Sequence, residues 1–140
     1  ALLAGLVHDI GELAIIQYAN QSKLSSISDS DLDAAVRHLK GPLGAILLRH
    51  WGLDDEFVIA ARFADEFDKQ TPNGILLLDL VQVAQLHAQA GTSMALSLQD
   101  ITQIPAIAKL GLATEGPEKS ISLLRESRAE IETIRLALAL

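Results

Sequence analysis

Apolar side chains recur every three to four residues along most of the chain, which is the spacing of one face of an α-helix. No segment alternates between apolar and polar positions over a useful length, as a half-buried strand would. Short loops rich in Gly, Pro, Ser and Asp separate the apolar segments. The pattern predicts an all-α fold, a compact bundle of about six to eight helices in a single domain over residues 1–140.

The first predicted helix runs from about Ala1 to Asn20, and its apolar arc is wide enough that we expect it to be largely buried. Gly5 and Gly11 would each cost a helix interior about 1 kcal/mol relative to Ala, so their presence indicates close packing against another backbone. The chain has no initiator Met and opens directly in this helical pattern. We therefore expect that the N-terminal helices of the domain are missing.

Capping residues and breakers place the later helices. Ser28 or Ser30 can cap a short helix that ends near Lys40, because each has an Asp three residues further on. Pro42 is then suited to the first position of a new helix. The remaining helices are expected at residues 55–67, at residues 74–90, around Pro105, which must break or kink its helix, and over residues 115–140.

Composition excludes several classes of protein. The 140 residues are 49% hydrophobic and 21% charged, as in soluble globular domains, and the absence of cysteine excludes disulfides and thiolate metal sites. The net charge of −7, with scattered basic residues, argues against a nucleic-acid partner. The longest pure apolar run, "ALLAGLV", falls far short of the ~20 residues of a membrane span. We expect a cytoplasmic protein without membrane contact.

His8 and Asp9 are adjacent polar residues inside the apolar first helix, and such a pair can contribute to a metal site. Consecutive helical positions point about 100° apart, so a site would need further ligands from other helices. Glu12 lies one turn beyond His8, where its carboxylate can approach both members of the pair. The alternative is a partly buried polar pair with locally satisfied hydrogen bonds, and the residues alone favour it.

The other polar groups are assigned to structure. His50 stands at a predicted helix end, where a cationic imidazole is favoured by the helix dipole. Asp65, Glu66 and Asp68 are expected to form a solvated, charged helix end. The sequence contains neither a phosphate-binding loop nor a nucleophile elbow.

Three stretches carry a family resemblance: "ALLAGLVHDIGELAI", "GPLGAILLRHWGLDDEFVIAARF" and "LLLDLVQVAQLHAQ". They resemble the HDOD domains, the HD-related output domains of bacterial signalling proteins and degenerate members of the HD and HD-GYP phosphohydrolase superfamily. The G-x-x-L-L-x-x-W-x-L spacing in the second stretch is fairly specific. The resemblance covers essentially the whole chain, which would be the C-terminal two-thirds of such a domain.

The resemblance also implies where metal ligands stand in catalytic relatives. This chain keeps the pair His8 and Asp9 but departs at the other positions: Glu12 replaces a Lys, Lys40 a His, Phe63 and Ala64 two histidines, and Gln85 an Asp. These side chains cannot replace anionic or imidazole ligands of a divalent cation. The resemblance therefore implies a vestigial pair, with no metal site, no cofactor and no catalytic residue.

On this resemblance we expect a non-catalytic signalling or output module of a bacterial regulatory protein that interacts with other signalling proteins or domains. Glu12, Lys40, Phe63 and Gln85 are then expected as residues of the former cleft. Lys40 itself is expected to be an exposed loop residue, although a cation at this position could meet an anion. The alternative function is a metal-dependent phosphohydrolase or phosphodiesterase on nucleotides or cyclic dinucleotides, with His8 and Asp9 binding a metal that the missing segment completes.

Overall fold

The computed structural model describes residues 1–21, 27–72, 74–89, 103–112, 133 and 136–137. The elements in these residues are α1 (Leu2–Val7), α2 (Ile10–Gln21), α3 (Asp29–His50), α4 (Asp55–Phe63), α5 (Leu77–Gln89) and α7 (Pro105–Lys109). Helices are the regular structure of the described part, which confirms the predicted all-α class. Most of the helix predicted over residues 115–140 lies outside the described residues, as does the segment 90–102 before Pro105.

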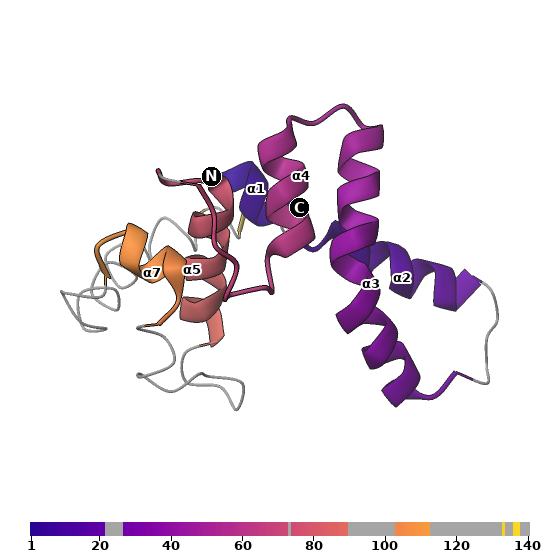
Figure 1. Ribbon diagram of the computed structural model, residues 1–140. Helices are drawn as coiled ribbons and strands as arrows, with labels where there is room; N and C mark the ends of the chain where they lie inside the picture. The colour runs from indigo at the N-terminus through magenta and orange to yellow at the C-terminus, as the bar shows by residue number, and fades with distance from the viewer. Residues whose placement is uncertain (22–26, 73, 90–102, 113–132, 134–135, 138–140) are drawn as a thin grey trace.

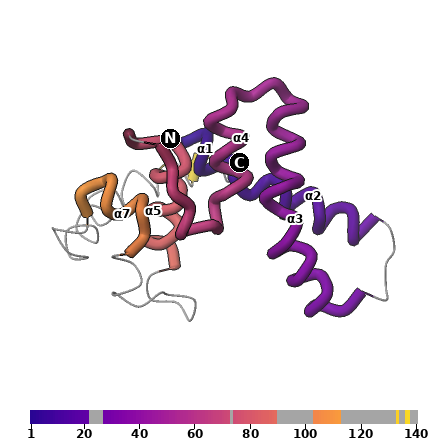
Figure 2. Tube along the Cα trace, in the orientation of Figure 1, coloured from indigo at the N-terminus to yellow at the C-terminus, as the bar shows by residue number. Residues whose placement is uncertain are grey.

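Helices that follow one another along the chain pack side by side, α2 on α3, α3 on α4, α4 on α5 and α5 on α7. Figure 1 shows α2 and α3 at one end of this row and α5 and α7 at the other. The tube in Figure 2 follows the same path. The short helix α1 departs from the order, because it lies against α4 and α5 rather than beside α2 alone. The junction between α1 and α2 is therefore held between the two ends.

The first predicted helix is in fact two helices, which break at His8 and Asp9. The Nδ1 atom of His8 donates a hydrogen bond of 2.7 Å to the carbonyl oxygen of Gly5. In a continuous α-helix this carbonyl would accept from the amide of Asp9. The His8 side chain thus occupies the carbonyl oxygen of Gly5, whose hydrogen bond to the Asp9 amide would continue the helix. The prediction of one helix from Ala1 to Asn20 is wrong.

This N-terminal segment is also far less buried than expected. Only Ala4 and Gly11 are buried within Leu2–Gln21, whereas Leu6 and Leu13 are exposed. Small residues face the neighbouring helices because the backbones approach closely there. Taken as one segment, Leu2–Gln21 has the length and apolarity that could cross a membrane, a criterion that core helices and signal sequences also meet. The expected absence of membrane contact stays a prediction.

The prediction of two helices on either side of Pro42 is wrong, since α3 is a single helix of 22 residues. The predicted N-cap is confirmed, because Ser28 Oγ accepts a hydrogen bond of 3.2 Å from the amide of Asp31. A proline inside a helix removes one hydrogen bond and crowds the preceding turn, at a cost of about 3 kcal/mol. Gly41 stands directly before Pro42 and has no Cβ, which relieves part of this crowding. Packing against α2 and α4 supports the helix through the proline.

Glycines allow two other segments to approach α3 closely. A Cβ atom at Gly11 would overlap the carbonyl oxygen of Lys40, and a Cβ atom at Gly41 would lie 2.6 Å from the carbonyl oxygen of Arg62. Among the described residues, the predicted close packing is confirmed for Gly11 and wrong for Gly5, where a Cβ atom would meet none of them within 4 Å. These approaches hold the middle of α3 between the α1–α2 junction and the end of α4.

Candidate functional site

Lys40, in the middle of α3, is the centre of a charged cluster. Its Nζ atom lies 2.9 Å from Asp9 Oδ1 and 2.9 Å from Asp65 Oδ2. The side chain of Lys40 is 16% exposed, against 42% for Asp9 and 48% for Asp65. The expectation of an exposed loop residue is wrong, because α3 continues through this position and is packed on both sides. The anions that Lys40 meets are carboxylates of the protein itself.

His8 lies beside the same carboxylate. Because a carbonyl oxygen can only accept, the hydrogen bond to Gly5 places a proton on Nδ1 of His8. The Nε2 atom lies 3.0 Å from Asp9 Oδ2, within ion-pair distance. This buried nitrogen is not aligned for a hydrogen bond to that oxygen or to any other described group. Asp9 is therefore contacted by His8 through one oxygen and by Lys40 through the other.

Electrostatics within the cluster favour the charged forms. The contact with His8, together with Lys40, lowers the pKa of Asp9 to about 2 against the opposing effect of burial. The contact with Asp9 raises the pKa of His8, again against burial. Burial opposes the ammonium of Lys40, but the contacts with Asp9 and Asp65 outweigh it and raise its pKa. Lys40 and Asp9 are thus both ionised at neutral pH.

Two glutamines extend the cluster to α5. Gln85 Nε2 donates to Asp65 Oδ1 at 3.3 Å. Gln82, one turn earlier, is buried and its Nε2 donates to the carbonyl oxygens of Phe63 at 3.1 Å and Glu66 at 2.9 Å. Gln82 thereby gives a second donor to two carbonyls at and just after the end of α4, each of which also accepts from a backbone amide. This tether fixes the turn that carries Asp65.

The structure brings together Lys40 and Gln85 of the four expected cleft residues, with Asp65 between them. Glu12 makes no side-chain hydrogen bond or ion pair with the described residues, because the break after His8 removes the helical spacing that would have joined them. Phe63, the last residue of α4, instead lines the cavity between α3 and α4, and its ring contacts the cationic side chains of Arg62 and Lys69.

Sequence reasoning missed the role of Asp65, which was expected to be solvated. It is a half-exposed bridge between Lys40 and Gln85. Its position two residues after Phe63, just beyond the end of α4, could have indicated that its side chain lies near α5.

The donor set around Asp9 does not suit the metal that the HD enzymes would imply. The described residues contain no group of three or more His, Asp or Glu side chains arranged to hold a metal ion. Both oxygens of Asp9 are engaged, one by an ammonium group at 2.9 Å. A divalent cation would have to displace that ammonium against charge repulsion. The arrangement is chemically an ion-pair network.

Comparison with known proteins bears on this arrangement. Residues 1–67 match the family model of the HDOD domain. The HDOD match includes His8, Asp9, Lys40 and Asp65, and ends before Gln85. No curated protein and no solved structure matches the chain. The extension of the resemblance to the whole chain, and to the C-terminal two-thirds of a domain, stays a prediction.

Proposed function

We propose that this chain is a non-catalytic HDOD-like output module of a bacterial regulatory protein, which acts in the cytoplasm by binding other signalling proteins or domains. The observation that carries the proposal is the ammonium group of Lys40 at 2.9 Å from Asp9. A catalytic metal would activate water and bind a phosphate oxygen through open coordination positions. An ammonium group supplies positive charge without such positions.

The positions that the resemblance assigns to metal ligands support descent from an HD-type enzyme. Residues 8, 9, 40 and 85 come from the α1–α2 junction, α3 and α5, and all belong to one chain of polar contacts through Asp65. An enzyme that lost its ligands while keeping its packing would leave such a geometry. In this chain the same positions hold helices together, which is a structural role.

Protein is the kind of partner that the surface favours. The net charge of −7 opposes binding to phosphate backbones and to anionic lipid surfaces. Several large apolar side chains are exposed, including Ile46 on α3 and Ile59 on α4. Exposed apolar side chains of this kind are suited to contacts with another protein.

The test is metal content and hydrolysis in the same preparation. The purified chain is incubated with Mn²⁺, Fe²⁺ or Zn²⁺, then analysed for bound metal and for hydrolysis of bis(p-nitrophenyl) phosphate and of a cyclic dinucleotide. We expect no hydrolysis that depends on His8, so that His8→Ala changes stability or partner binding alone. About one metal ion per chain, lost together with hydrolysis in His8→Ala, would establish the phosphohydrolase alternative.

A further inference from the structure

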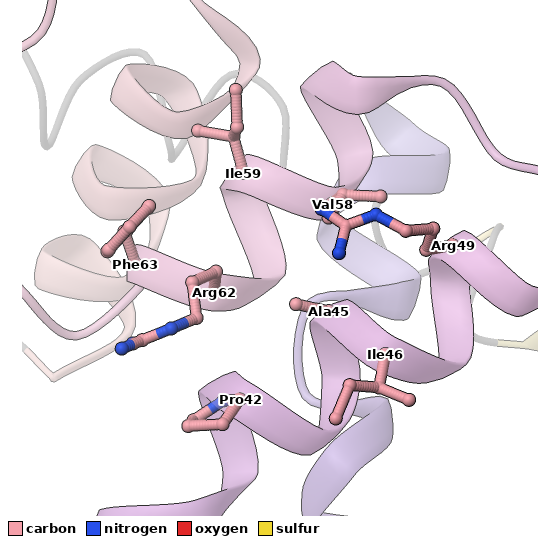
Figure 3. A pocket seen from close by; sticks show the side chains of 8 residues that line it. All are labelled: Pro42, Ala45, Ile46, Arg49, Val58, Ile59, Arg62 and Phe63. Carbon is pink, nitrogen blue, oxygen red and sulfur yellow. The ribbon is translucent and has the colours of Figure 1, made fainter.

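A groove of about 390 Å³ lies between α3 and α4 on the face shown in Figure 3. The α3–α4 groove is defined by Ala45, Ile46 and Arg49 of α3 together with Val58, Ile59 and Arg62 of α4. Ala45 and Val58 are buried and form its floor, whereas Ile46 and Ile59 are exposed. It is distinct from the Lys40 cluster, none of whose residues lines it.

The apolar part of the groove has room for a side chain from outside. Ile46 is 61% exposed and Ile59 is 38% exposed, although both border a floor of small, buried residues. A single exposed Ile is common on protein surfaces. Two of them on opposite helices, with a hollow between, form a place where an incoming Leu, Ile or Phe would lose much of its contact with water.

Two arginines give the groove a charge opposite to that of the protein. Arg49 and Arg62 border it, whereas the whole chain carries 18 acidic and 11 basic residues. Figure 3 shows Arg49 reaching from α3 toward Val58. Arg62 is paired with Glu66 at 3.1 Å, but this ion pair is exposed and therefore weak enough to exchange for another carboxylate. The groove is thus complementary to a segment that is both apolar and acidic.

We propose that the α3–α4 groove docks a segment of a partner protein that inserts one or two apolar side chains between Ile46 and Ile59 and presents carboxylates to Arg49 and Arg62. This inference rests on the proposed function: it names the surface that would bind another protein and the chemistry of the bound segment. Anionic membranes and nucleic acids are disfavoured, because two arginines on a chain of net charge −7 attract a local carboxylate far better than an extended polyanion.

A displayed library of random peptides of about twelve residues, panned against the whole chain, supplies the probe. Selected peptides are synthesised with a fluorescent label and titrated with four variants of the protein. Ile46→Asp and Arg49→Glu change the groove. Leu13→Asp is the matched apolar control, since Leu13 is 62% exposed on α2, and Arg37→Glu is the charge control on α3. Circular dichroism establishes that each variant retains the helical fold.

We expect the selected peptides to carry Leu, Ile or Phe beside Asp or Glu. Ile46→Asp should weaken binding by about tenfold or more, and Arg49→Glu by about threefold to tenfold, with the effect of Arg49→Glu shrinking between about 0.05 M and 0.5 M salt. Leu13→Asp and Arg37→Glu should change affinity by less than about twofold.

Three results would contradict the proposal that the α3–α4 groove docks a partner segment. The first is a selection that enriches basic peptides or none. The second is a set of peptides that bind Ile46→Asp as tightly as the unaltered chain, which would leave a protein-binding role at another surface standing. The third is binding of phosphatidylserine vesicles or duplex DNA that Arg49→Glu abolishes. Failure of the proposed function itself is read separately, from His8-dependent metal content and hydrolysis.

Discussion

Replacement of Lys40 by Met tests whether the cluster around Asp9 stabilises the fold. The Met side chain keeps most of the aliphatic length of the largely buried Lys40 side chain and removes its charge. The change leaves Asp9 and Asp65 without the ammonium that lies 2.9 Å from each. Exposed ion pairs contribute about 0.2–1 kcal/mol each, whereas loss of one partner of a buried pair costs about 3–5 kcal/mol. Since Lys40 is 16% exposed but its partners are 42% and 48% exposed, we expect a loss of about 1–2 kcal/mol in the free energy of unfolding.

The same interaction predicts a pH dependence. The pKa of Asp9 is about 2 in the folded protein, against an ordinary value of 3.8, so its contribution to stability is present above pH 3.8 and is lost as the pH falls through about 2. The full difference in pKa corresponds to about 2.4 kcal/mol, but the contact with His8 is its largest cause and Asp9 is 42% exposed to screening solvent, so we assign only about 0.5 kcal/mol of it to Lys40. The cost of Lys40→Met should therefore shrink below about pH 4.

Urea denaturation followed by far-ultraviolet circular dichroism measures these changes, with Arg37→Met as the control for loss of a positive charge elsewhere on α3. A double-mutant cycle with Asp9→Asn isolates the pair, and we expect a coupling of about 0.5–1 kcal/mol at neutral pH. A coupling near zero, or a cost for Lys40→Met that is unchanged at about pH 2, would refute the assigned role of Lys40.

Further substitutions test the packing around the cluster, each by urea denaturation. Gly11→Ala should cost about 3 kcal/mol or more, because its Cβ atom would overlap the backbone of α3. Gly5→Ala should be neutral or stabilise the protein by up to about 1 kcal/mol. Similar effects at both sites would contradict the close approach of α2 to α3. Gln82→Leu should cost about 1–2 kcal/mol because it removes two hydrogen bonds to the carbonyls of Phe63 and Glu66, which each keep one backbone donor, and a cost below about 0.5 kcal/mol would argue against the tether. Ser28→Ala should cost about 1 kcal/mol through loss of the N-cap of α3, and an unchanged midpoint would argue against capping.

Local features of the chain were readable from the amino-acid sequence. The helical spacing of apolar residues identified the all-α class, and the Ser28–Asp31 pattern marked the start of α3, because capping depends on residues within one turn. Close packing at Gly11 was also predicted from a glycine in a helical pattern, but the same argument failed at Gly5 among the described residues, so the residue type alone did not decide it. The HDOD resemblance singled out the Lys40 and Gln85 positions, which the structure places in the same cluster.

Tertiary contacts decided the rest. The break at His8 depends on a side chain that competes for a backbone carbonyl, and the continuity of α3 through Pro42 depends on packing by α2 and α4, so local propensity misjudged both. Lys40 became a half-buried partner of two carboxylates because close backbone approaches place its helix between Asp9 and Asp65. A sequence specifies which side chains can carry charge, but the distance between charges that lie 25 or 31 positions apart exists only after the helices have packed.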